Sequence, residues 1–257
     1  MDFLPKLLLH FRLLKYSYGF RFLQGFIHDN SLLSTGLKYL KRGDTAIDIG
    51  ANNGGSSLLL SALVGKSGFV YSFEPNAAIA KQLLSYVDLN YFNNITAFLF
   101  GIGCSNSIHK FYVDCRNGSQ ASTFEPHHRE SEITHNKASF DETLVEIRTL
   151  DSFNFSRVDF IKIDVEGFEL EALVGSLNTI KKFNPVIYFE CFFDDNIPNL
   201  LDKKLSLSKL FNELHYTLDI IECFTSHDFS PTTSINLSHL SVNKHTGFEI
   251  LARPNSN

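Results

Sequence analysis

Two acidic residues stand at the ends of two short apolar runs in the first third of the sequence. Asp48 lies in the run 45–49, before a turn rich in glycine and asparagine, and Glu74 closes the run 69–74. Glycine lets the backbone turn sharply and approach a ligand, and a following helix offers free N–H groups. A carboxylate such as that of Glu74 can accept hydrogen bonds from both hydroxyls of a ribose. The pattern predicts a nucleoside pocket.

The spacing of the glycines distinguishes between two kinds of ligand. A dinucleotide site is typical of G-x-G-x-x-G, which brings three glycines against a pyrophosphate, whereas here the spacing is Asp48-x-Gly50-x-x-x-Gly54. S-adenosylmethionine fits this turn better, because it has no diphosphate, and a carboxylate, loop amides and asparagine side chains suffice for its amino-acid tail and sulfonium. The predicted cofactor-binding residues are Asp48, Gly50, Ala51, Asn52, Gly54, Glu74 and Pro75.

A second group of ionisable residues, Lys162, Asp164 and Glu166, follows later in the chain. Methyl transfer is an in-line displacement, in which a protein mainly aligns the acceptor oxygen and excludes water. A hydroxyl acceptor reacts faster when a carboxylate takes its proton, so we expect Asp164 and Glu166 to be catalytic. Lys162 lies on the same strand face as Asp164, where it either orients Asp164 or the acceptor, or forms a structural ion pair.

Two alternatives for this chemistry stay open. Asp164, Glu166 and Glu190 could instead supply oxygen ligands to a divalent metal such as Mg²⁺. A long polar loop also contains His127 and His128, and either imidazole could act as the base in place of Asp164. Long loops of this kind often serve as lids over a site.

The segments that must position these residues alternate between strands and helices. From their apolar patterns and turn residues, strands are expected at 45–49, 69–74, 95–100, 159–164, 185–191, 216–221 and 248–253. Helices are expected at 55–65, 77–91, 168–183 and near 208–214. Between the third and fourth strands the alternation fails, and a hairpin around 109–114 and a strand at 145–150 are expected there.

This alternation predicts an α/β fold of the Rossmann-like, doubly wound type. We expect a mostly parallel sheet of seven strands, with an antiparallel pair at one edge formed by the last two strands. Ligands of such sheets bind beyond the carboxyl ends of the strands, which is where both groups of candidate residues fall. A chain of 257 residues suits one domain, here 44–257, preceded by a helical extension over 1–43.

Four sequence blocks, in this order, carry a resemblance to a known family: IDIGANNGGSS, FEPN, TLDSFNFSRVDFIKIDVEGFELEALVGS and NPVIYFEC. They resemble the FkbM family of methyltransferases over about residues 44–192. The resemblance implies a class I methyltransferase fold and S-adenosylmethionine as the cofactor. It also implies O-methylation of a hydroxyl, on a sugar, a glycan or a secondary metabolite.

Composition narrows the partners and the location. The net charge is −5, and the basic residues form no long stripe, so nucleic acid is not expected as a partner. The four cysteines show no metal-site spacing and are expected to be reduced thiols of a cytoplasmic protein. Residues 1–28 are apolar and aromatic with four basic side chains, too often interrupted by charge to span a bilayer. They either cover the core as a helix or contact a membrane surface.

Two other functions compete with methyl transfer. The same kind of sheet could bind NAD(P) in an oxidoreductase, although the glycine spacing argues against it. The chain could also be a non-catalytic protein that binds a nucleoside or attaches to a membrane through residues 1–28. The oligomeric state cannot be derived from these patterns.

Overall fold

The computed structural model describes residues 30–88, 93–114, 124, 140–193, 200–223, 231–240 and 246–255. Both interpretations of residues 1–28, a helix that covers the core and a membrane contact, therefore lie outside the described ranges, and so does a histidine base at His127 or His128. Within the described ranges, every helix is too short or too polar to cross a membrane.

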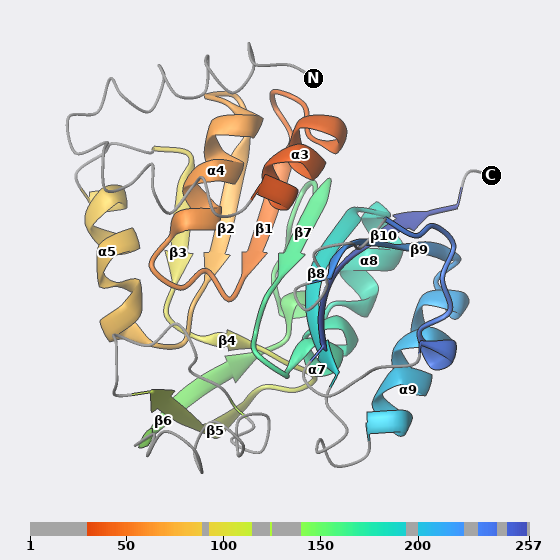
Figure 1. Cartoon of the computed structure of the whole chain (residues 1–257). Helices are drawn as coiled ribbons and strands as arrows, with labels where there is room; N and C mark the ends of the chain where they lie inside the picture. The colour runs from red at the N-terminus through yellow and green to blue at the C-terminus, as the bar shows by residue number, and fades with distance from the viewer. Residues whose placement is uncertain are drawn as a thin grey trace.

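A sheet of seven strands forms the centre of the molecule, in the order β3-β2-β1-β7-β8-β10-β9 (Figure 1). The first five of these are parallel, and β10 is antiparallel to both β8 and β9. The mostly parallel sheet with an antiparallel pair at one edge is thus confirmed. The strands are β1 (Thr45–Ile49), β2 (Phe69–Phe73), β3 (Ile95–Phe98), β7 (Phe160–Ile163), β8 (Val186–Phe193), β9 (Tyr216–Cys223) and β10 (Thr246–Pro254).

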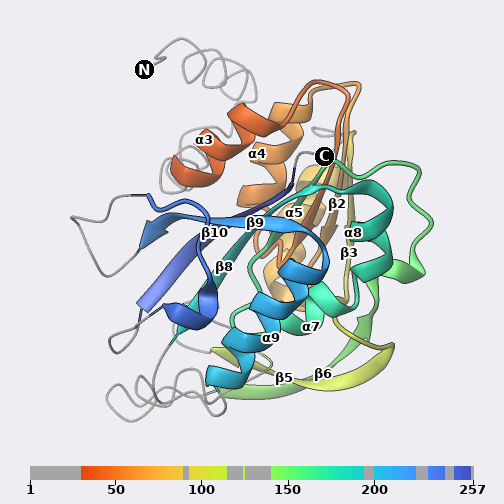
Figure 2. The ribbon, with the colours of Figure 1, turned by 90° about the vertical axis from the view of Figure 1, so that its right-hand side faces the viewer.

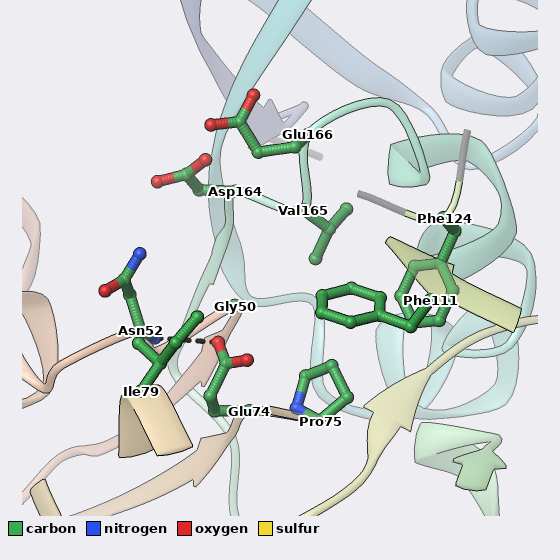
Figure 3. Close-up of a pocket in the computed structure, with 10 residues that line it drawn as sticks. All are labelled: Gly50, Asn52, Glu74, Pro75, Ile79, Phe111, Phe124, Asp164, Val165 and Glu166. Atoms are coloured by element: carbon green, nitrogen blue, oxygen red, sulfur yellow. Dashed lines mark hydrogen bonds between the residues drawn. The ribbon is translucent and has the colours of Figure 1, made fainter. Parts of the chain in front are cut away.

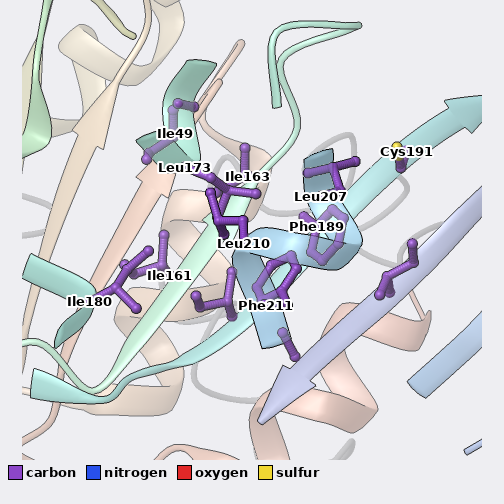
Figure 4. Close-up of a cluster of buried hydrophobic side chains, with 14 of the residues drawn as sticks. Ile49, Ile161, Ile163, Leu173, Ile180, Phe189, Cys191, Leu207, Leu210 and Phe211 are labelled. Carbon is purple, nitrogen blue, oxygen red and sulfur yellow. The ribbon is translucent and has the colours of Figure 1, made fainter. Parts of the chain in front are cut away.

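Helices cover both faces of this sheet, as Figure 2 shows from the side. One face packs against α3 (Asn30–Tyr39), α4 (Gly55–Val64) and α5 (Ala77–Asp88), and the other against α7 (Glu169–Val174), α8 (Leu177–Phe183) and α9 (Leu200–Glu213). Because side chains alternate along a strand, Ala46 of β1 packs with the first set and Ile47 with the second. The second layer is drawn in Figure 4, where Phe189 of β8 stacks on Phe211 of α9 with ring centroids 5.4 Å apart.

The single helix expected over 168–183 is wrong, because the structure divides it into α7 and α8. A Cβ atom at Gly175 would lie 1.9 Å from the carbonyl oxygen of Gly103, so the backbone of another segment passes where the helix would continue. A new helix starts at Leu177, since the carboxylate of Asp151 accepts hydrogen bonds from amides of its first turn. The last predicted helix also begins earlier than expected, at Leu200.

A second, smaller sheet lies below the end of the main sheet to which β1, β2 and β3 point (Figure 1). It contains β4 (Gly101–Ile102), β5 (Ser107–Asp114) and β6 (Phe140–Arg148), in the order β4-β6-β5. The expected strand at 145–150 is thus longer and starts at Phe140, and β5 pairs with it in antiparallel fashion. Phe111, Val145 and Ile147 are buried on the inner face of this sheet. The smaller sheet therefore covers the carboxyl end of the main sheet.

Candidate active site

A pocket lies at the carboxyl ends of β1, β2 and β7, between these strand ends and the smaller sheet (Figure 3). Since these three strands are parallel neighbours, the residues that follow them meet at one edge. One half of the lining is polar and the other half is apolar. The lining residues are Gly50, Asn52, Glu74, Pro75, Ile79, Phe111, Phe124, Asp164, Val165 and Glu166.

Gly50 brings the first loop into contact with the turn after β7. Its φ angle is +81°, and a Cβ atom there would lie 1.8 Å from the carbonyl oxygen of Asp164. The amides of Gly50 and Ala51 both donate to the carbonyl of Phe73, at 2.9 and 3.0 Å, which ties the loop to the end of β2. No residue other than glycine fits this position without a shift of the backbone.

Glu74 points its carboxylate into the polar half of the pocket (Figure 3). One carboxylate oxygen accepts from the amide of Asn52 at 2.9 Å, and the other from the amide of Asn76 at 2.8 Å. Burial raises the pKa of Glu74 to about 7, against the opposing effect of these two hydrogen bonds and of the Lys162 charge. Each oxygen can still accept a second hydrogen bond, so the group can serve two ligand hydroxyls.

Asp48 lies below the pocket and not in its lining. The side chain is fully buried, and one oxygen accepts from the hydroxyls of Ser56 and Ser57 at 2.7 and 2.6 Å. This carboxylate therefore ties the first turn of α4 to β1. Of the residues predicted to hold the cofactor, Asp48, Ala51 and Gly54 lie outside the pocket lining, whereas Gly50, Asn52, Glu74 and Pro75 belong to it.

Lys162 contacts both the loop that follows β1 and the turn that follows β7. Its ammonium lies 3.1 Å from Asp164, 3.6 Å from Asp48 and 3.4 Å from the carbonyl oxygen of Gly50, and its side chain is 6% exposed. These contacts agree both with an ion pair of structural role and with orientation of Asp164, the two roles left open for Lys162. A buried ammonium costs free energy unless it is paired in this way. The pairing holds Asp164 beside the first loop of the pocket.

Asp164, Glu166 and Glu190, the three carboxylates predicted to act on the acceptor or to bind a metal, differ in burial. Asp164 and Glu166 line the pocket, while Glu190 of β8 is mostly buried and lies outside the pocket lining. Burial, together with the charges of Asp164 and Glu166, raises the pKa of Glu190 to about 10, so this group is protonated at neutral pH. In the part of the chain that the structure describes, no three or more histidines, cysteines or acidic residues are arranged to hold a metal ion. The magnesium alternative gains no support there.

Apart from Pro75, the apolar half of the pocket was not predicted. Phe111 of β5 and Phe124 lie 4.7 Å apart between ring centroids, and Ile79 and Val165 complete the surface. Ile79 lies one turn into the helix after Pro75 and could have been found from that spacing. Phe124 stands in a polar stretch with no pattern around it.

The strand order defines a Rossmann-like α/β fold, and the pocket lies where ligands of such sheets bind, at the carboxyl ends of the strands. The sequence model of one family, the Methyltransferase FkbM domain, matches residues 48–231, well over half of the chain. The chain belongs to the FkbM family of methyltransferases, as its sequence blocks predicted. A comparison with curated proteins gave no match.

Several solved structures are similar in fold at low identity. The FkbM methyltransferase of Methylobacillus flagellatus KT is 18% identical with a TM-score of 0.48, and the alignment covers 82% of this chain and 44% of that chain. This chain thus spans less than half the length of that protein. SMU.1697c, a putative methyltransferase from Streptococcus mutans solved in complex with SAH, is 12% identical with a TM-score of 0.47, over 86% and 94% of the two chains.

Proposed function

We propose that the protein transfers the methyl group of S-adenosylmethionine to a hydroxyl group of a sugar, a glycan or a secondary metabolite. Membership of the FkbM family supports methyl transfer. The assignment of the cofactor rests on Glu74. Its buried carboxylate points into the pocket, and each of its oxygens can accept a second hydrogen bond.

The pocket residues fit the parts of this cofactor. Glu74 would accept from the ribose hydroxyls, and the apolar surface of Pro75, Ile79 and Phe111 would pack against the adenine ring. Gly50 and Asn52 would hold the amino-acid end near the first loop. Asp48, which lies below this loop, would act by fixing it to α4 and would not touch the cofactor.

The cofactor, when bound, supplies an electrophilic methyl group on a sulfonium. Asp164 or Glu166 would accept the proton of the acceptor hydroxyl while its oxygen forms the bond to the methyl carbon and the carbon–sulfur bond breaks. Lys162, 3.1 Å from Asp164, would keep this carboxylate in place beside the first loop. Glu190 lies outside the pocket lining, and burial raises its pKa, so it would not compete as a base.

Isothermal titration with S-adenosylhomocysteine, the demethylated product, tests the proposal, with NAD as the parallel ligand. We expect saturable binding of S-adenosylhomocysteine, and no binding of NAD. Binding of NAD alone would favour the oxidoreductase. If neither ligand binds, the cofactor assignment is wrong. Incubation of the protein with labelled S-adenosylmethionine and hydroxyl-bearing metabolites then tests the acceptor class.

A further inference from the structure

Lys203 of α9 contacts the turn that follows β7 and lies outside the pocket lining. Its ammonium donates to the carbonyl of Gly167 and lies 3.3 Å from a carboxylate oxygen of Glu169. The other oxygen of Glu169 accepts from the amide of Gly167 at 2.7 Å. Both backbone polar groups of Gly167 are thus held by one ion pair.

This ion pair is buried, since the Lys203 side chain is 12% exposed and that of Glu169 is 2% exposed. Removing two charges from water costs free energy that their attraction does little more than offset, so a buried pair is weak evidence for stability. The position of the pair on one turn points to another role. We call Lys203, Glu169 and the Gly167 peptide groups that they hold the clamp.

The turn under the clamp has a backbone that needs support. Glu166 has a φ angle of +52° and Gly167 of +110°, so two consecutive residues lie in the left-handed region. A residue with a Cβ atom such as Glu166 adopts this region at a cost and keeps it only when its surroundings hold it there.

The same turn forms a wall of the pocket. Asp164, Val165 and Glu166 all line it, and the carbonyl of Asp164 lies where a Cβ atom of Gly50 would be. A change in this turn would therefore move the wall against the first loop and redirect two carboxylates.

We propose that Lys203 and Glu169 are positioning residues, which fix the turn at Glu166–Gly167 and so set the shape of the pocket and the direction of Asp164 and Glu166. The effect on a ligand rests on the proposed function. The effect on the turn does not.

Lys204, the next residue of α9, provides a matched control. Its side chain is also buried, and its ammonium also donates to a backbone carbonyl, that of Leu240, at 3.0 Å. Lys203→Met and Lys204→Met therefore each remove a buried lysine from the same helix, but only the first removes the clamp. Lys203→Arg and Glu169→Gln, which keep charge and size respectively, serve as second variants if Lys203→Met does not fold.

The test measures hydrogen exchange over residues 162–170, calorimetric binding of S-adenosylhomocysteine and the thermal midpoint of each variant. Lys203→Met and Glu169→Gln should raise both the exchange rate of the turn and the Kd by about tenfold. Lys203→Arg should restore the Kd in part. Lys204→Met should lower the midpoint as much as Lys203→Met and leave both other values unchanged.

Equal effects of Lys203→Met and Lys204→Met on the exchange rate of the turn and on the Kd would overturn the proposal, because the clamp would then act through stability alone. So would faster exchange of the turn with an unchanged Kd, since the turn would not shape the pocket. If the unaltered protein fails to bind S-adenosylhomocysteine, the proposed function falls. The exchange rates then test the effect of the clamp on the turn. Unchanged exchange in Lys203→Met overturns this effect, and exchange that is faster in Lys203→Met but not in Lys204→Met supports it.

Discussion

The pKa of Glu74 predicts how cofactor affinity depends on pH. The ribose hydroxyls can only donate to Glu74 fully when its carboxylate is ionised, and burial raises its pKa from 4.5 to about 7. Binding should therefore compete with a proton on this group. We expect the affinity for S-adenosylhomocysteine to fall as the pH drops through 7.

The size of the effect follows from the ionised fraction of Glu74. With a pKa of about 7, this fraction is about 0.9 at pH 8 and about 0.1 at pH 6. The apparent Kd rises as the competent fraction falls, so it should be about tenfold higher at pH 6 than at pH 8. In Glu74→Gln the dependence should vanish. Its Kd at pH 8 should rise by about tenfold to a hundredfold, because a hydrogen bond to a charged group contributes about 1.5–3 kcal/mol.

Calorimetric titration of both proteins at pH 6, 7 and 8 and constant ionic strength checks this reasoning. The Glu74→Gln variant is the control for any titration of the ligand or of other groups. An affinity of the unaltered protein that is constant between pH 6 and 8 would show that Glu74 has an ordinary pKa or does not contact the ligand. Equal pH dependence in both proteins would assign the titration to another group.

Three further substitutions and one change of ligand test other parts of the site. Asp164→Asn should leave the Kd for S-adenosylhomocysteine within about twofold and lower kcat by about 10²-fold or more; normal turnover would show that Asp164 is not the base. Gly50→Ala should destabilise the protein by more than about 2 kcal/mol in urea unfolding, because its Cβ atom meets a backbone oxygen; an unchanged midpoint would contradict this. The raised pKa of Glu190 means that the folded protein binds this proton more tightly than the unfolded chain, so the protein loses stability as the pH rises from about 4.5 to about 10. Glu190→Gln should reduce this loss. Parallel curves of unfolding free energy against pH for the two proteins would refute the prediction. Binding of S-adenosylmethionine at pH 7 should release more protons than binding of S-adenosylhomocysteine, because its sulfonium charge favours the ionised forms of nearby carboxyl groups. Calorimetry in buffers of different ionisation enthalpy measures this release, and equal release would show that the sulfonium does not act on these groups.

The strand-end residues of the pocket could be predicted because their signal is local. The run before Gly50 and the run before Glu74 each read as a strand, and parallel strands bring their ends to one edge regardless of the remaining packing. The position of Asp48 could not be read in this way. Whether a carboxylate at a strand end faces a ligand or the next helix depends on Ser56 and Ser57, and their hydroxyls turn it inward.

Other features depend on segments that meet only in the folded chain. The division between α7 and α8 follows from the approach of Gly103, more than seventy positions earlier, and nothing near Gly175 except the glycine itself signals it. The contact of Lys203 with Gly167 likewise joins α9 to the turn after β7, and the sequence pattern of each segment alone gives no sign of it. The sequence pattern therefore predicts which strand ends carry chemistry, and packing decides which groups reach the ligand.

Protons balance part of the negative charge around the pocket. Lys162 lies between Asp48 and Asp164, while the raised pKa values of Glu74 and Glu190 mean that these two groups hold protons over part or all of the neutral range. A ligand with a positive charge near them would favour their ionised forms and so bind more tightly than a neutral ligand of the same shape. The sulfonium of S-adenosylmethionine has that charge, and the thioether of the demethylated product lacks it. In the proposed reaction, the same arrangement would therefore favour release of the product after methyl transfer.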